Sequence, residues 1–323
     1  MATGGWDAIV AAAEEEGQAN ALVTDTPAWQ EIQTAMFKEN TGLTMNIAAS
    51  GPNADLETRV LAEIKSGNVQ TDLMQDTDRG FYTKNADQFV DLSTLDLPNW
   101  DSYPESAKWQ NLCVNSKMGV SGITYNTDLV PEDMVPDSWE DLTDPFWKDK
   151  IVLSNPQPGG YYMQWALMMR EAFGDDFLEA IAAQNPTLDN SSVAAAEKVA
   201  SGAALISFMS QADSAAGLIA KGAPLKFKLM RGPDIGSNVC VGILKDGPNP
   251  NAAAVLLNHL MSEESQSTPC KAGLAVVSPV DAEGCYEVPE DFEYPTLDAE
   301  TGQYPGLDDE ALKAEVLGLL GIG

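Results

Sequence analysis

The first 80 residues alternate between short apolar runs and amphipathic stretches, and this alternation limits the possible folds more than any other feature. Apolar runs at 21–24, 43–49 and 71–74 predict three strands, and the stretches between them predict helices. The first helix is expected to begin at Pro27 with Thr26 as its N-cap. Such a β-α-β-α-β unit predicts a mostly parallel sheet with right-handed crossovers.

Glycines mark where these helices should end. The first helix should end at Gly42, and the second, which begins at Asn53 or Asp55, should end at Gly67. In a sheet of this kind, ligands bind beyond the carboxyl ends of the strands. The candidate binding residues of this unit are therefore those that end or follow its strands: Asp25, Thr26, Ser50, Gly51, Asp76 and Asp78.

A second unit of the same kind spans residues 150–230. A Gly159-Gly160 turn opens onto a helix at 162–173, another helix is expected around 192–200, and a strand at 204–209 leads to a further helix. Two such units predict two independent sheets in two lobes that face one another across a ligand cleft. A single continuous sheet would argue against that arrangement and against any function that depends on it. The candidates from this unit are Gly160, Tyr161, Tyr162, Ser210, Gln211 and Asp213.

The candidate residues are suited to binding rather than to catalysis. Helix N-termini in both sets offer unpaired N–H groups for a carboxylate, phosphate or phosphonate. The aspartates Asp76, Asp78 and Asp213 offer negative charge for an ammonium group, and Tyr161 and Tyr162 offer ring faces and hydroxyls. Together they favour a zwitterionic or cationic organic solute. The alternatives are that Tyr162 belongs to the core and that Asp213 only caps a helix.

The charge of the chain excludes other partners. Its 49 acidic residues against 18 Lys and Arg give a formal net charge of −31, which repels nucleic acid and anionic membranes. The acids are dispersed and 44% of the residues are hydrophobic, so we expect a globular protein with a solvated acidic shell rather than an acidic partner-binding tail. No run approaches the roughly 18 apolar residues that span a bilayer. The start, Met1-Ala-Thr-Gly-Gly, is typical of residues joined to a mature N-terminus, so we expect no signal peptide in this sequence.

Few enzyme classes fit the sequence. Its one histidine, His259, lies in an apolar context, and neither G-x-S-x-G nor a P-loop occurs, which excludes a Ser-His-Asp enzyme, a His-ligated zinc site and a P-loop NTPase. Asp76 and Asp78 resemble the first ligands of a calcium-binding loop. The next ligand position is Gly80 instead of Asp or Asn, and the last is Asp87 instead of Glu, so we do not expect calcium binding. The same two acids share one loop, without the separation that glycosidases use. We expect no cofactor and no metal; a carboxylate-dependent hydrolase and an acidic scaffold are the rival classes.

Several motifs resemble a transport family. Residues 138–151 resemble the "S-W-x-D-L-x-x-P-x-W-K-x-K-I" segment of periplasmic solute-binding proteins that serve ABC importers, in the ferric-binding-like group. Residues 120–129 resemble the family's "Y-N-T-x-L" crossover strand, and 250–266 resemble its "N-A-A-x-x-x-x-N-x-x-x-S-x-E-x-Q" helix. The resemblance runs from Trp6 to Gln266. It implies an α/β, type II periplasmic-binding-protein fold of two lobes, each a mostly parallel sheet flanked by helices, with the ligand cleft between them.

The resemblance also implies a role and a division of the chain. Lobe one is expected to comprise 1–118 plus 240–288, and lobe two 119–239 plus 289–323, with a docked terminal helix at 312–320. The implied protein is a monomer that closes on a small-molecule ligand and presents it to the membrane permease of an ABC importer. It catalyses nothing, and it lies in the periplasm or outside the cell, lipid-anchored or secreted.

The ferric alternative fits the sequence poorly. Laying the iron-binding pattern of the family on Gly202 places its adjacent tyrosine pair at Ala212 and Asp213, and no histidine lies near Asp25. Only Tyr162 matches a third tyrosine of some iron binders, so it would be a metal ligand only if the ferric alternative held. We prefer an amine-containing organic solute, such as a polyamine, an aminoalkylphosphonate or a thiamine-like cation, over a bare anion, because the net charge of −31 opposes the approach of free anions.

The four cysteines permit three pairings. Cys270 and Cys285 flank a loop-rich stretch, and Cys113 and Cys240 each lie beside a segment interpreted as an interlobe connection. We favour disulfides within these two pairs; four free, buried thiols are the alternative.

Overall fold

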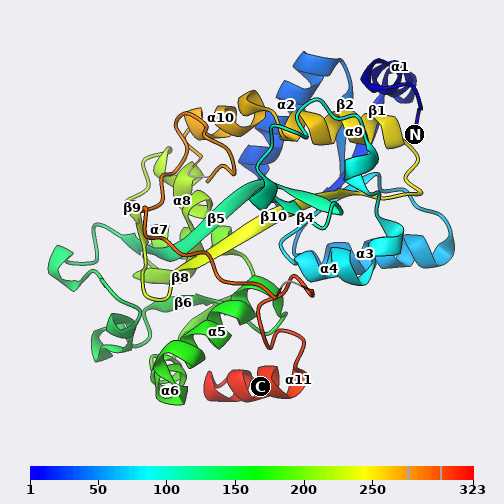
Figure 1. Cartoon of the computed structure of the whole chain (residues 1–323). Helices are drawn as coiled ribbons and strands as arrows, with labels where there is room; N and C mark the ends of the chain where they lie inside the picture. Colours follow the sequence, from blue (N-terminus) through cyan, green and yellow to red (C-terminus); the bar gives the residue numbers. More distant parts are fainter. Residues whose placement is uncertain (275–276, 299) are drawn as a thin grey trace. The chain divides into compact units, whose positions relative to one another are not determined.

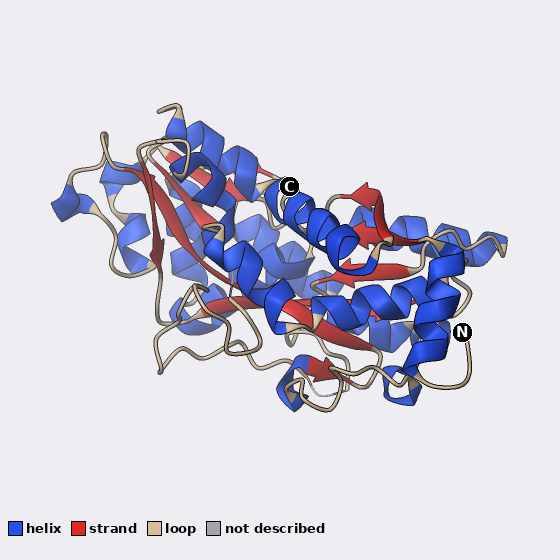
Figure 2. Ribbon diagram, turned by 90° about the horizontal axis from the view of Figure 1, so that it is seen from above, coloured by secondary structure: helices blue, strands red, loops and turns tan. Residues whose placement is uncertain are grey.

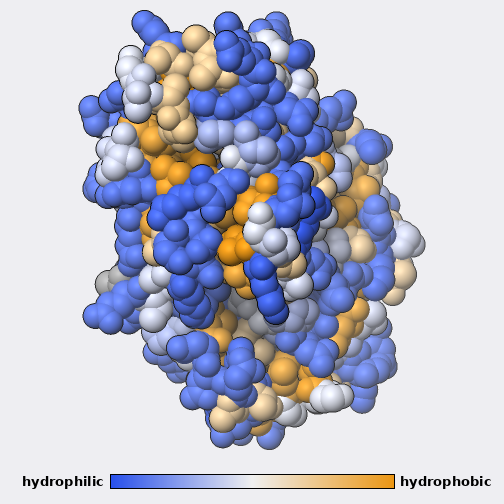
Figure 3. Space-filling model, turned by 90° about the vertical axis from the view of Figure 1, so that its right-hand side faces the viewer, coloured by the Kyte–Doolittle hydropathy of each residue, from blue (hydrophilic) through white to orange (hydrophobic). Residues whose placement is uncertain are grey.

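The structure is a computed structural model that describes residues 1–274, 277–298 and 300–323. The described residues divide into two compact units. Unit 1 takes its residues from 1–118, 238–286 and 299–302, and unit 2 from 119–237, 287–298 and 303–323. Helices flank the strands of these units (Figure 2), and hydrophilic residues cover most of the face that Figure 3 shows.

Unit 1 begins with the alternation that the sequence predicts, preceded by a helix that it did not predict. Its elements are α1 (Trp6–Glu16), β1 (Gln18–Val23), α2 (Pro27–Thr41), β2 (Thr44–Ser50), α3 (Asn53–Ser66), β3 (Leu73–Asp76), α4 (Arg79–Lys84), β4 (Lys108–Trp109), the first part of β5 (Cys113–Asn126), most of β10 (Ile235–Ile243), α9 (Pro250–Leu260) and α10 (Glu263–Lys271).

The sheet of unit 1 is covered on both faces. β1 pairs in parallel with β2 and β3, and β10 runs antiparallel to β3. Ala21 and Val23 pack in one hydrophobic cluster and Leu22 in another, because successive strand residues point to opposite faces. The first cluster includes residues of α1, α2 and α9, and α1 lies against α9 (Figure 1); the second includes residues of α3 and α4.

The predicted helix ends are confirmed in this unit. Thr26 is the N-cap of α2 and accepts a hydrogen bond from the Trp29 N–H at 3.4 Å, with Pro27 at the first helical position. α2 ends at Gly42 and α3 ends at Gly67, both in the left-handed conformation that glycine adopts readily. These signals are local in sequence, so no tertiary contact is needed to interpret them.

Unit 2 has its own strand and helix set. Its elements are the rest of β5, β6 (Ile151–Ser154), α5 (Gly160–Phe173), α6 (Asp175–Ala183), β7 (Thr187–Asp189), α7 (Ser192–Ala200), β8 (Ile206–Gln211), α8 (Ala212–Ile219), β9 (Leu225–Leu229), the start of β10 and α11 (Glu310–Leu319). β6 pairs in parallel with β7 and β8, and β5 runs antiparallel to β8 and β9. α11 packs against α5 and α6.

Two expectations for unit 2 need correction, and two elements were missed. The helix expected to begin at Tyr162 begins at Gly160. The strand expected to end at residue 209 continues to Gln211, because Ser210 and Gln211 pair with Gly122 and Ser121 of β5. Ser210 and Gln211 are therefore strand residues, and α8 begins directly after them. The sequence analysis also did not predict α6 and β7.

The strands do not form two independent sheets. Eight of the described strands follow one hydrogen-bonded path in the order β2-β1-β3-β10-β5-β8-β6-β7, and β4 and β9 each pair with β5, so this expectation is wrong. The reason is that β5 and β10 each contain a boundary between the two units, at 118/119 and 237/238 respectively. Each of these long strands therefore contributes residues to both units.

Both disulfides have the pairing that the sequence favours. Cys113 is bonded to Cys240, which lies 127 residues away in sequence, and Cys270 is bonded to Cys285. All four cysteines belong to unit 1. The first disulfide links β5 to β10, and the second links α10 to the segment that follows it.

Candidate functional site

Three parallel strands of unit 1 end at one edge of its sheet. Val23, the last residue of β1, pairs with Ser50, the last residue of β2, and Leu22 pairs with Met74 of β3. The six candidates of this unit end or follow these strands, so they lie along this edge: Asp25, Thr26, Ser50, Gly51, Asp76 and Asp78.

Hydrogen bonds bring some of these candidates together. The side-chain N–H of Gln30 donates to the Asp25 carbonyl oxygen and to the Ser50 hydroxyl, both at 2.7 Å. The Gly51 N–H donates to the Val23 carbonyl at 3.2 Å. The Thr26 hydroxyl is used in the cap of α2. This part of the edge is therefore held by a glutamine that the sequence analysis did not single out.

The carboxylate of Asp25 is buried and paired. Its Oδ1 lies 2.5 Å from Lys117 Nζ, and both side chains are almost fully buried. Lys117 lies in the unit 1 part of β5, and the sequence analysis missed it because the pair spans 92 positions of the chain. A paired carboxylate is less available to a cationic ligand than an unpaired one.

The carboxyl group of Asp76 is hydrogen-bonded to that of Glu57 in α3, a residue that the sequence analysis also missed. Burial raises the pKa of Asp76 well above its usual range, and the charge of Glu57 adds to this. Burial also raises the pKa of Glu57, with a contribution from Asp78, and the two carboxyls share a hydrogen bond. Asp76 Oδ1 accepts the Asp78 N–H at 2.7 Å, and Asp78 caps α4 through the Gly80 N–H.

We expect the Glu57–Asp76 pair to make stability fall as the pH rises. The raised pKa values mean that the folded state holds a proton that the unfolded state releases above about pH 4, so stability is lost as the pH rises through the folded pKa. Asp76→Asn should therefore have a melting temperature that falls less between pH 5 and 8 than that of the wild type. The variant keeps an acceptor for the Asp78 N–H. Parallel curves for the two proteins would contradict this assignment.

Three strands of unit 2 also end at one edge. Ser154 of β6 pairs with Asp189 of β7, and Leu153 pairs with Phe208 of β8. α5, α7 and α8 begin beyond these ends. Gly159 and Gly160 both have positive φ, at 89° and 60°, so the turn into α5 uses the conformations that glycine permits.

The two tyrosines at the start of α5 are held by serines of this edge. The Tyr161 hydroxyl donates to Ser121 Oγ at 2.9 Å and is also hydrogen-bonded to Ser237. Tyr162 shares hydrogen bonds with Ser154 and Ser192. Desolvation raises the pKa of both phenols, so both are neutral at ordinary pH. Their ring centroids lie 6.2 Å apart.

The remaining candidates of unit 2 differ in their surroundings. Ser210 is buried, and its hydroxyl is hydrogen-bonded to Thr124 Oγ1 at 2.8 Å. Gln211 is half-buried at the end of β8. Asp213 is buried in the first turn of α8, and its charge raises the pKa of Tyr162. The structure therefore brings Asp213 close to Tyr162, and Gly160 is exposed at the start of α5, two positions before Tyr162.

Tyr294 joins this group, although the sequence analysis assigned its segment, 289–323, only to lobe two. Its ring packs so closely on Gly236 that a Cβ there would lie 2.4 Å from a ring carbon. Asp234 Oδ2 accepts the Glu293 N–H at 2.9 Å beside it. Burial raises the pKa of Tyr294 to about 12, and Tyr294 in turn raises the pKa of Tyr161. No local pattern marks this tyrosine, because its position depends on a distant glycine.

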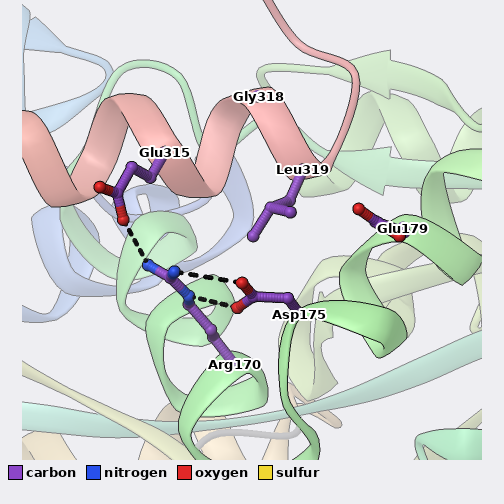
Figure 4. Close-up of a pocket in the computed structure, with 6 residues that line it drawn as sticks. All are labelled: Arg170, Asp175, Glu179, Glu315, Gly318 and Leu319. Carbon is purple, nitrogen blue, oxygen red and sulfur yellow. Dashed lines mark hydrogen bonds and ion pairs between the residues drawn. The ribbon is translucent and has the colours of Figure 1, made fainter.

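The pocket in Figure 4 does not contain any of the predicted site residues. Its cavity of about 430 Å³ is lined by α5, α6 and α11, and Arg170 lies within it. Arg170 pairs with Asp175 at 2.6 Å and with Glu315 at 3.1 Å, so these charges satisfy one another. We assign this pocket to the docking of α11 rather than to a ligand.

His259 has the structural role that its context indicates. It is buried and its ring lies 5.4 Å from that of Phe37. Burial lowers its pKa to about 4, so it is neutral at ordinary pH. Within the part of the chain that the structure describes, no group of three or more His, Cys, Asp and Glu side chains could hold a metal ion.

Solved structures identify the fold, which is that of the two-lobed periplasmic-binding proteins. The substrate-binding protein of an ABC transporter from Agrobacterium tumefaciens matches with a TM-score of 0.80 and 16% identity, over 95% of this chain and 96% of that chain. AfuA from Actinobacillus pleuropneumoniae, with exogenous fructose-6-phosphate bound, matches at 0.77 and 18%, over 95% and 100%. Iron-bound HitA from Pseudomonas aeruginosa matches at 0.70 and 16%, over 94% and 98%. The expectation that a continuous sheet would argue against this fold is therefore wrong.

The family is identified by sequence. The profile of the bacterial extracellular solute-binding proteins matches residues 33–281, and the chain belongs to this family. A comparison with curated proteins finds no match. Members of the class bind small ligands and work with a membrane permease, and the family implies a periplasmic or extracellular location. None of the helices in the described ranges is long and apolar enough to cross a membrane.

Proposed function

We propose that this protein captures an amine-containing organic solute, such as a polyamine, an aminoalkylphosphonate or a thiamine-like cation, for an ABC importer. The two lobes close on the solute, which binds the closed state better than the open one and shifts the population toward it. The protein acts as a monomer, has no nucleic-acid partner and catalyses no reaction.

One observation carries the amine assignment, which is the proximity of Asp213 to Tyr162 at the carboxyl ends of the strands of unit 2. A buried carboxylate attracts an ammonium group more strongly than an exposed one, because water screens it less. The neutral rings of Tyr161 and Tyr162 add faces that attract cations. Serine hydroxyls beside both tyrosines provide further acceptors.

Unit 1 contributes less negative charge than its sequence suggests. Asp25 is paired with Lys117, and the pKa of Asp76 is raised by burial. Asp78 caps α4. We assign recognition of the ammonium group chiefly to Asp213 because it is buried beside Tyr162, and we expect these three aspartates to shape the edge of unit 1.

A thermal-shift screen tests this proposal. We expect an amine from a panel of polyamines, aminoalkylphosphonates and thiamine to raise the melting temperature, because a ligand at 100 times its Kd stabilises the folded state by about 2.7 kcal/mol. Asp213→Asn should weaken binding of that amine by about 100-fold, as truncation of a buried charge partner does. Tyr161→Ala should weaken it as well.

A matched control is available in the same unit. Asp175→Asn removes a carboxylate that pairs with Arg170 in the pocket of Figure 4, and it should leave amine affinity unchanged. Equal losses in Asp213→Asn and Asp175→Asn would show a general charge effect and would overturn the site. Turnover of any panel compound would instead favour the carboxylate-dependent hydrolase.

Ferric iron is the second candidate, because Tyr161, Tyr162 and Tyr294 gather in unit 2. Iron(III) would need their phenolates, and desolvation opposes the loss of these protons. Ferric citrate is therefore included in the screen. A visible charge-transfer band that appears with ferric citrate and is lost in Tyr162→Phe would favour iron over the amine.

A further inference from the structure

Arg79 is an exception among the arginines of this acidic chain. The sequence has four arginines, and three of them pair with carboxylates: Arg59 with Glu63, Arg170 with Asp175, and Arg231 with Asp234. Arg79 makes no ion pair with any carboxylate of the described residues, although it is 8% exposed and the chain has 49 acids. Figure 4 shows the contrast, since Arg170 there lies between two carboxylates.

The surroundings of Arg79 fix its position without neutralising its charge. One Nη donates to Asn115 Oδ1 at 3.0 Å, and the guanidinium lies 5.3 Å from the ring of Trp109. Its Nε–H is buried and has no acceptor among the described atoms. Burial lowers the pKa of Arg79 to about 10, and no neighbouring charge offsets this. A buried charge without a partner is costly, so a partner from solution would stabilise it.

The place of Arg79 in the fold suits a ligand. It is the first residue of α4, three positions after the end of β3, at the edge of the sheet where β1 and β2 also end. Asn115 donates to Asn238 at 2.8 Å, which fixes the amide so that its oxygen faces the guanidinium. Asn238 lies two residues before Cys240, the partner of Asp76 in the ladder, so it belongs to the same edge.

We propose that Arg79 is the oxyanion-binding residue of unit 1 and that it takes a carboxylate, phosphate or phosphonate group of the captured solute. The planar guanidinium matches such groups, and its fixed contact with Asn115 and Trp109 reduces the entropy lost on binding. The inference rests on the proposed function. It narrows the solute from amines in general to zwitterions such as aminoalkylphosphonates.

Nuclear magnetic resonance of the arginine side chains tests the site without knowledge of the solute. The four Nε–Hε resonances are assigned by substituting Arg59, Arg170 and Arg231 in turn with lysine, which leaves that of Arg79. Methylphosphonate and inorganic phosphate are then titrated at constant ionic strength, with chloride as the control. We expect a saturable shift of the Arg79 resonance alone. The absence of a saturable shift, or a shift confined to the other arginines, would overturn the proposal.

Binding measurements separate this inference from the proposed function. Arg79→Gln should weaken 2-aminoethylphosphonate by about 10- to 100-fold and leave ethylamine unchanged, whereas Asp213→Asn should weaken both. Arg59→Gln, in the same unit, is the matched control and should change neither. If the protein binds amines but Arg79→Gln does not change the affinity for 2-aminoethylphosphonate, the inference is wrong and the proposed function stands. If methylphosphonate shifts the Arg79 resonance but no amine binds, the oxyanion site stands and the amine assignment is wrong.

Discussion

Loss of the Cys113–Cys240 disulfide is expected to lower the free energy of unfolding by about 5 kcal/mol in the double variant Cys113→Ala/Cys240→Ala. The bond closes a loop with a sequence separation of 127 residues, so it removes many conformations from the unfolded chain. Alanine is chosen rather than serine, because both positions are 0% exposed and serine would leave an unpaired hydroxyl at each of them. Urea denaturation followed by circular dichroism would measure the loss.

The second disulfide provides the comparison. Cys270→Ala/Cys285→Ala opens a loop with a separation of only 15 residues and should cost about 3 kcal/mol. The order of the two losses is the test of the loop-length argument. A Cys113–Cys240 variant that loses less than the Cys270–Cys285 variant would show that native-state contacts, and not the unfolded chain, determine the effect.

Trp165→Ala is expected to lower the free energy of unfolding by about 3–5 kcal/mol, as removal of a buried aromatic residue does. Trp165 is fully buried on α5, and its ring lies 6.2 Å from that of Trp139 and 5.3 Å from that of Phe208. The collapse of this cluster would also release the first turn of α5, which carries Tyr161 and Tyr162.

A second aromatic residue of the same helix is the control for Trp165. Phe173 is only half-buried and packs on Phe177 at 5.1 Å, so Phe173→Ala should cost clearly less. Urea unfolding of both variants provides the comparison. A loss below about 1.5 kcal/mol for Trp165→Ala would mean that the cavity closes by repacking and that the cluster does not hold α5.

The sequence predicts those parts of the fold that depend on local chemistry. Thr26, Pro27 and Gly42 set the ends of α2 through contacts within one turn, and the structure confirms them. The end of β8 was missed because Gln211 belongs to the strand only through its pairing with Ser121, a residue 90 positions earlier. The missed helix α1 did have a signal, since its buried residues Ile9 and Ala13 are spaced by one helical turn.

The candidate site shows the same limit. Each set of predicted residues follows strand ends, and strand ends can be located by pattern. The residues that set the charge at those ends come from elsewhere in each unit: Glu57 beside Asp76, Lys117 beside Asp25, and Tyr294 beside Tyr161. The two residues of each pair are separated by 19 to 133 positions in sequence, which is beyond the range of any local pattern.

The threading of β10 has a consequence for how the protein is made. β3 lies between β1 and β10 in the sheet, but the ribosome completes β10 only after it has synthesised residues 119–237, most of unit 2. During that interval β3 has one row of unpaired backbone groups, a template for association with other nascent chains. Residues 119–237 can therefore fold first. The sheet of unit 1 is completed only when β10 has been translated.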